Sequence, residues 1–139
     1  MRASIDAMDR HREPGKSGRP RLSREDALLR VLVWIEHREC APFGLDEIYA
    51  AAGVSPRTLR TMFVDVFGMT PRRYLRVRRL HQVRTLLLLT EPRLCTVADV
   101  CTRLRVTDAG RFAHEYHELF GEFPSQTLAQ PVVPPTRLR

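Results

Sequence analysis

One motif occurs twice in this chain, and the repeat limits the possible folds more than any other feature. The order aromatic, any three residues, Phe-Gly, any two residues, Pro is found at 63–71 and again at 116–124. Apolar positions upstream of this motif also correspond between the two copies. Their separation in sequence is one residue shorter than that of the motif itself, so the second copy has one added residue near its turn. The corresponding pairs are Leu45 with Val97, Ile48 with Val100, Val54 with Val106 and, at the longer offset, Leu59 with Phe112. The repeat therefore predicts two copies of one folding unit.

The first copy extends back to residue 45 and has the features of two short helices joined by a tight turn. Gly53 stands where the chain must reverse, and glycine adopts a left-handed backbone conformation without steric cost. Ser55 is a favoured N-cap, Pro56 suits the first helical position, and Gly68 is a stop signal. Apolar residues recur at helical spacing along the second helix, at Leu59, Met62, Phe63, Val66 and Phe67. This pattern is typical of a helix-turn-helix.

Helical patterns continue on both sides of this unit. Ser23 with Asp26 and Thr96 with Asp99 are capping pairs that mark the start of two helices. We expect further helices at 24–39, 71–89, 97–104 and 108–120. The predicted fold is all-α, with two helix-turn-helix subdomains joined by a long central helix. The expected parts are a flexible basic arm or linker remnant at 1–22, the first unit at 23–70, the linking helix at 71–90, the second unit at 91–129 and a loose C-terminal tail at 130–139.

The charge balance favours a polyanion as partner. The net charge is +7 and the pI is about 10.3. All but one of the 23 basic residues are arginines, a bias that a GC-rich genome also produces. No acidic residue occurs between Asp65 and Glu91, where arginines crowd the predicted linking helix. We expect some of them to contact phosphate and the others to pack against acidic residues or to be solvated. They are Arg72, Arg73, Arg76, Arg78, Arg79 and Arg84.

Several other classes of protein are disfavoured. No apolar stretch is long enough for a transmembrane helix, and the N-terminus has no secretory signal. Cys40, Cys95 and Cys101 lack CxxC spacing and are interpreted as reduced, half-buried thiols. The run 114–117 has a histidine at each end, but a metalloprotease helix needs the second histidine one position later, where Glu118 stands. We expect no enzyme activity, no metal and no cofactor.

The sequence resembles the DNA-binding domain of AraC/XylS-type bacterial transcription regulators over roughly residues 24–129. The most specific matches are 51–59, 67–75 with Arg79-Leu80 after it, and 110–112 leading to 119–125. The resemblance implies about seven helices, two DNA-reading units and control of transcription initiation, most often activation. If both units lie on one face, two recognition helices can enter successive major grooves, about 34 Å apart.

The resemblance also implies roles for single residues. The first recognition helix would present Arg57, Arg60 and Thr61 to base edges, and arginine can bind guanine O6 and N7 through two hydrogen bonds. Ser55 and Thr58 would help to hold the DNA backbone. An alternative for the two arginines is an exposed salt bridge with Asp65 or Asp46.

In the second unit, the matching positions carry small side chains or few donors. We therefore expect this copy to contact mainly phosphate, through Arg111 and His114, with weak sequence readout. The matching positions are Ala109, Gly110, Ala113 and His114, with Arg111 beside them. Arg72 and Arg73 are the candidate phosphate contacts at the start of the linking helix.

Two positions depart from the family pattern, and we expect them to affect fine specificity more than the fold. The family usually has glycine in the second turn, where this chain has Arg105, followed by Val106 in place of an aromatic residue. A non-glycine residue with positive φ is strained, so this turn is expected to be reshaped or less stable. Tyr49 stands where a small residue is common, on the side that faces the first recognition helix.

The predicted function is that of a sequence-specific transcription regulator, an activator in preference to a repressor. It would bind double-stranded promoter DNA in the bacterial cytoplasm, at the nucleoid, with RNA polymerase as a further candidate partner. An effector would bind a domain absent from this chain. The chain is expected to be a small stand-alone regulator or, preferably, the C-terminal piece of a longer one. The alternatives are a basic helical protein with non-specific nucleic-acid or RNA binding, and a protein-interaction antagonist that has lost specific DNA binding.

Overall fold

A computed structural model describes residues 23–38 and 43–132 of the 139-residue chain. Seven helices and no strands are present in these ranges. The helices are α1 (Arg24–Glu36), α2 (Leu45–Ala52), α3 (Pro56–Phe67), α4 (Pro71–Leu89), α5 (Val97–Arg103), α6 (Ala109–Phe120) and α7 (Pro124–Leu128). The all-α prediction and the predicted long central helix are therefore confirmed. The expected basic arm at 1–22 and most of the expected tail lie outside the described residues.

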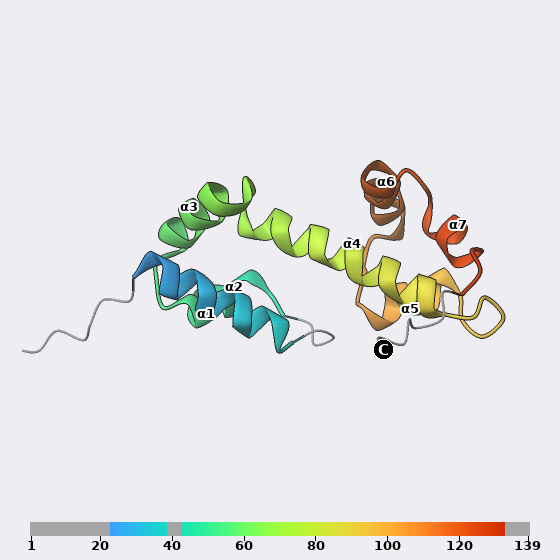
Figure 1. Cartoon of the computed structure of the whole chain (residues 1–139), viewed down its shortest axis with the longest axis horizontal. Helices are drawn as coiled ribbons and strands as arrows, with labels where there is room; N and C mark the ends of the chain where they lie inside the picture. Colours follow the sequence, from blue (N-terminus) through green and yellow to red (C-terminus); the bar gives the residue numbers. More distant parts are fainter. Residues whose placement is uncertain (1–22, 39–42, 133–139) are drawn as a thin grey trace, which may run out of the picture.

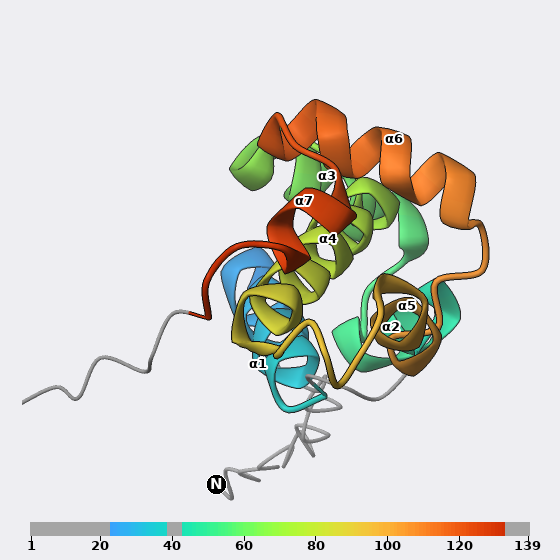
Figure 2. The same ribbon diagram turned by 90° about the vertical axis from the view of Figure 1, so that its right-hand side faces the viewer.

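The long helix α4 runs through the middle of the molecule and joins two groups of short helices. Helices α1, α2 and α3 gather at its N-terminal half, and α5, α6 and α7 gather at its C-terminal half (Figure 1). Helices α3 and α6 lie on the same side of α4, with α1, α2 and α5 on the opposite side. The view turned by 90° shows the same arrangement (Figure 2). The two helices predicted to read DNA therefore share one face.

Local sequence explains where the helices begin and end. The side chains of Ser23, Ser55, Thr70, Thr96 and Asp108 each accept a hydrogen bond from the backbone N–H three residues later. The two predicted capping pairs are confirmed, because the Asp26 and Asp99 carboxylates also accept hydrogen bonds from their capping hydroxyls. Gly53, Gly68 and Gly121 end α2, α3 and α6 in the left-handed conformation.

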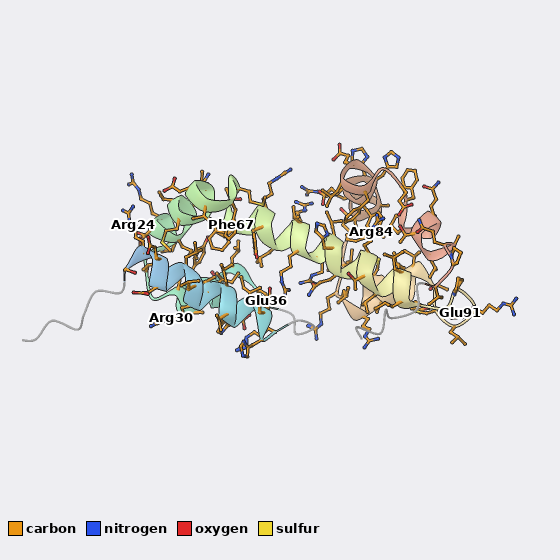
Figure 3. All side chains as sticks on the ribbon, viewed as in Figure 1. Arg24, Arg30, Glu36, Phe67, Arg84 and Glu91 are labelled. Carbon is orange, nitrogen blue, oxygen red and sulfur yellow. The ribbon has the colours of Figure 1, made fainter. Side chains whose placement is uncertain are left out.

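Two separate hydrophobic cores are buried on either side of the middle of α4. The first is built from α1, α2 and α3, and it extends to Tyr74 and Leu75 at the start of α4. The second begins at Leu80 and is built from α4, α5 and α6. Phe67 packs against the first core, and Arg84 covers a ring of the second (Figure 3). The segment 76–79 therefore bridges two cores that do not merge.

The structure corrects some details of the predicted helices. Helix α1 ends at Glu36 rather than 39, α5 ends at Arg103, and α6 begins at Ala109. Val66, which fits the apolar spacing of α3, is 60% exposed, whereas Phe67 beside it packs against the first core and the Tyr74 ring. Trp34 lies at the edge of the first core, where its ring meets Phe43 edge-on at 5.1 Å between centroids.

The two turns adopt the same backbone conformation at corresponding positions. Gly53 has a φ of 65° and Arg105 a φ of 53°, and Arg105 is the only non-glycine residue with positive φ in the described ranges. The added residue also falls where it was predicted. One residue separates Gly53 from the N-cap of α3, whereas Val106 and Thr107 separate Arg105 from the N-cap of α6. Arg105 therefore has the positive φ on which the predicted strain depends, and its φ stays close to that of the glycine in the first turn.

Candidate nucleic-acid interface

The N-terminal half of α3 presents an exposed basic surface. Arg57, Arg60 and Thr61 are exposed, and no ion pair in the described part of the chain involves either arginine. The alternative salt bridge with Asp65 or Asp46 is not formed. The Thr61 hydroxyl donates to the Arg57 carbonyl at 3.1 Å, which fixes its rotamer along the helix. Both guanidinium groups are therefore available to an external acceptor.

Ser55 and Thr58 hold the start of α3 in place. The Ser55 hydroxyl accepts from the Thr58 N–H at 3.2 Å, and the two side-chain oxygens lie 2.8 Å apart. These hydrogen bonds form the N-cap and orient the first turn of α3. The free backbone N–H groups of this turn carry the positive end of the helix dipole. A phosphate near this turn would meet a preorganised donor surface.

The matching face of α6 is less basic. Arg111 Nε donates to Glu115 Oε1 at 3.1 Å, and His114 Nε2 lies 3.3 Å from Glu118 Oε1. Ala109 and Gly110 are exposed and add no donor beyond the backbone, while Ala113 is half-buried. Both candidate phosphate contacts of α6 therefore have a carboxylate beside them, in contrast to the arginines of α3.

Arg72 and Arg73 mark the start of α4, between the two recognition helices in sequence. Both side chains are exposed, and neither forms an ion pair within the described residues. Helix α4 is capped by the Thr70 hydroxyl, which accepts from the Arg73 N–H at 3.3 Å. These two arginines add free positive charge beside a helix N-terminus, as phosphate contact requires.

The other four arginines of α4 turn toward the protein. Arg76 donates two hydrogen bonds to the Glu115 carboxylate, and its Nε lies 2.8 Å from Oε2. Arg84 Nη1 lies 3.0 Å from Glu122 Oε1, and the guanidinium covers the Phe120 ring. The sequence predicted that some arginines of this helix would pack against acidic residues, and the structure identifies Arg76 and Arg84 as two of them.

Arg78 and Arg79 have backbone partners that sequence reasoning missed. Arg78 donates to the Ile35 carbonyl of α1 at 3.3 Å, and Arg79 donates to the Leu104 carbonyl next to the second turn. Burial lowers the pKa of Arg79, although it remains a cation at neutral pH. A usable signal was present, because Arg79 stands four residues before the buried Val83 and so lies on the inward side of α4.

Two grooves flank the middle of α4 where the two units face each other. The first has a volume of about 350 Å³ and runs between the start of α4 and α6. Its charged lining residues are Arg72, Arg73, Arg76, Arg111, Glu115 and Glu118. The second, of about 490 Å³, lies on the side of the second turn and includes Arg79 and Arg105. Arginines outnumber carboxylates in the lining of both grooves, which favours an anionic occupant.

The described residues contain no other centre of chemistry. No group of three or more His, Cys, Asp or Glu side chains within them could hold a metal ion. Both described cysteines are free thiols; Cys95 is half-buried, as predicted, whereas Cys101 is buried, and Cys40 lies outside the described residues. No helix in the described ranges is long and apolar enough to cross a bilayer.

Two helix-turn-helix units with their second helices on one basic face define a DNA-binding protein. A family model described as a helix-turn-helix domain matches residues 48–130. The chain is 36% identical over 100 residues to the XylDLEGF operon transcriptional activator 2 of Pseudomonas putida, covering 72% of this chain and 64% of that protein. The chain belongs to the AraC/XylS family of transcription regulators, and the matched part is its DNA-binding domain, not an enzyme. It spans less than two thirds of the length of the Pseudomonas relatives it matches.

Solved structures show the same fold. A probable AraC family transcriptional regulator from Rhodopseudomonas palustris CGA009 superposes with a TM-score of 0.66 and 29% identity, over 76% of this chain and 99% of that one. The DNA-binding domain of AdpA, solved in complex with a target DNA, gives a TM-score of 0.64 at 22% identity, over 74% of this chain and 90% of that one. The second similarity concerns the fold alone. The family identified from the sequence and its seven-helix fold are confirmed.

Proposed function

We propose that this chain binds promoter DNA as a single protomer, with α3 and α6 in successive major grooves of one duplex. The observation that carries the proposal is the placement of both recognition helices on one side of α4 (Figures 1 and 2). Successive major grooves on one face of B-DNA are about 34 Å apart. A single chain with two recognition helices facing the same way can read two half-sites without dimerising.

The two helices have unequal roles in this proposal. Arg57, Arg60 and Thr61 read base edges, because their side chains are exposed and the two guanidinium groups have no carboxylate partner in the described structure. Ser55 and Thr58 fix the first turn of α3 against the DNA backbone.

Helix α6 acts mainly as a clamp on the DNA backbone. Ala109 and Gly110 let its N-terminus approach the duplex closely, and Arg111 and His114 supply phosphate contacts. Glu115 and Glu118 beside them lower the local positive charge, so sequence readout by α6 is weak. Arg72 and Arg73 contact phosphates between the two grooves.

The proposal extends to the biological role. The named Pseudomonas relative is a transcriptional activator, which supports activation rather than repression for this chain. RNA polymerase is then a partner, and an effector, if there is one, acts on a domain outside the described fold. The setting is the bacterial cytoplasm, at the nucleoid. The division into parts at 1–22, 23–70, 71–90, 91–129 and 130–139 stays a prediction.

Selection of bound sites from a random DNA pool tests this proposal most directly. We expect two short conserved elements about one helical turn apart, with the stronger conservation under α3. Arg57→Ala and Arg60→Ala should each reduce discrimination between the selected site and a mutated site by about 5- to 150-fold, since a bidentate arginine contact contributes about 1–3 kcal/mol. Arg72→Ala and Arg73→Ala should weaken binding to all DNA sequences alike. Each should also make the slope of log affinity against log salt concentration smaller by about one, because one phosphate contact is lost.

Arg93→Ala is the matched control, because Arg93 is exposed and belongs to the loop after α4, which lies at the end of α4 distant from α3 (Figure 1). It removes one charge and should leave discrimination between sites unchanged. Equal affinity for selected and random DNA at physiological salt would refute specific recognition and leave charge-driven nucleic-acid binding. Absence of DNA binding altogether would instead favour a protein-interaction role.

A further inference from the structure

Among the described residues, the main packing between the two DNA-reading units runs through α4. Their two hydrophobic cores share no residue, and the residues of α4 between Leu75 and Leu80 belong to neither. The orientation of one unit relative to the other therefore depends on this short stretch of one helix. An α-helix alone bends and twists under modest load, so any side chain that ties this stretch to a unit adds rigidity.

Three arginines in this stretch form such ties. Arg76 binds the Glu115 carboxylate of α6 with two parallel hydrogen bonds, a geometry that fixes both distance and angle. Arg79 donates to the Leu104 carbonyl at the turn before α6, and Arg78 donates to the Ile35 carbonyl at the end of α1. Two ties therefore reach the second unit, and one reaches the first.

The tie from Arg76 is the one that bears directly on a recognition helix. Arg76 stands one turn before Leu80, the first buried residue of the second core, so it fixes α6 to a part of α4 outside that core. Glu115 lies in the middle of α6 and is 23% exposed, and it also accepts a hydrogen bond from Arg111. The carboxylate therefore links α4 to the DNA-facing side of α6.

We infer that the Arg76–Glu115 pair is a brace that sets the angle between the two recognition helices and so determines which half-site spacing the protein accepts. This inference rests on the proposed reading of two half-sites. Arg76 and Glu115 are positioning residues here, acting through α6 rather than through contact with bases. Insertion of one base pair between the half-sites moves them apart by about 3.4 Å and rotates one relative to the other by about 35°. A protein with the Arg76–Glu115 pair intact cannot change the angle between its recognition helices to match the new spacing, whereas a protein without the pair can.

The test compares two variants that break the pair with opposite effects on net charge. Arg76→Gln removes one positive charge, and Glu115→Gln removes one negative charge. A direct electrostatic effect on DNA affinity therefore has opposite signs in the two variants, while loss of the brace has the same sign in both. Arg93→Gln is the matched control, since it makes the same charge change as Arg76→Gln at an exposed residue that has no ion pair in the described structure and no proposed contact with DNA.

The first measurement is affinity for the selected site and for versions with one base pair added or removed between the half-sites. We expect the wild-type chain and Arg93→Gln to bind the altered spacing roughly tenfold more weakly than the selected spacing, a loss of about 1.4 kcal/mol. Arg76→Gln and Glu115→Gln should each reduce that penalty to about threefold or less. A spacing penalty that stays at the wild-type value in both variants would overturn the brace.

The second measurement needs no DNA and keeps the brace separable from the proposed function. Spin labels are placed at Val66 and Leu119, exposed residues at corresponding positions of α3 and α6, and the distribution of distances between them is recorded. The background carries the replacements Cys40→Ser, Cys95→Ser and Cys101→Ala. We expect a narrow distribution for the wild-type chain and for Arg93→Gln, and a broader one for both brace variants. Equal widths in all four proteins would refute the brace, even if the chain shows no preference for any DNA site.

Discussion

The strained turn before α6 provides the sharpest test of how sequence and stability are related in this fold. Arg105 takes a φ of 53°, the conformation that Gly53 takes in the first unit. An L-residue other than glycine pays roughly 1–2 kcal/mol for a left-handed conformation. Glycine avoids this strain but loses more chain entropy on folding, by roughly 0.5–1 kcal/mol. Arg105→Gly should therefore stabilise the domain by a net of about 0.5–1 kcal/mol.

Arg105→Ala separates the strain from the side chain. Alanine keeps the unfavourable φ and removes the guanidinium, which is exposed and makes no hydrogen bond in the described structure. We expect Arg105→Ala to match the wild-type chain within about 0.5 kcal/mol, as is usual for a surface substitution. The difference between the glycine and alanine variants then reports the backbone strain.

Denaturant unfolding followed by circular dichroism measures both differences, and thermal unfolding should show the glycine variant about 2–5 °C above the wild-type chain. Arg103→Gly is a second control, because Arg103 is helical and an added glycine there should destabilise α5 by up to about 1 kcal/mol. If Arg105→Gly is no more stable than Arg105→Ala, the turn is not strained and the reasoning fails.

Two further predictions concern the second unit. Tyr116→Phe should destabilise this unit by about 1–2 kcal/mol in denaturant unfolding, because the Tyr116 hydroxyl lies 2.8 Å from the buried Thr127 hydroxyl. Tyr49→Phe is the control. It should have little effect, because the Tyr49 ring is half-buried and its hydroxyl has no such partner in the described residues. The Thr96 cap lowers the pKa of Asp99, so the stability from this carboxylate is present above its unfolded pKa near 4 and is lost as the pH falls through the lower folded value. Asp99→Asn should therefore flatten the dependence of stability on pH below about 4, and an unchanged acid profile would contradict this assignment.

Local signals predicted most of the fold, because most of its boundaries depend on residues close in sequence. Ser55 and Thr70 cap the helices that they precede, and Gly68 ends α3, each through contacts within four residues. The repeat also predicted the added residue in the second turn. Corresponding apolar residues must reach corresponding positions in the two cores, so a one-residue change in their sequence separation indicates a longer turn. Val66 and Phe67 both fit the apolar spacing, but only Phe67 packs against Tyr74 of α4, at 4.9 Å between ring centroids, and Val66 is left exposed.

The direction of each α4 arginine could not be predicted in the same way. Arg76 and Arg79 find their partners 39 and 25 residues away, so only the folded chain brings the groups together. Their spacing before Leu80 and Val83 indicates the inward side of α4, but that pattern does not identify the acceptor. Arg72, on the same side of the helix by spacing, remains exposed because it precedes the second core by two turns.

The shared carboxylate of Glu115 reconciles the weak charge of α6 with its proposed contact to DNA. A lone Arg111–Glu115 pair would have to break before Arg111 could reach a phosphate, and the carboxylate would be left near the anionic duplex without a partner. Here Arg76 holds the same carboxylate through two hydrogen bonds, so Arg111 can leave while Glu115 stays neutralised. Arg111 is also 62% exposed, against 38% for Arg76, and is the freer of the two to move. The brace and the phosphate contact therefore use one acidic residue without competing for it.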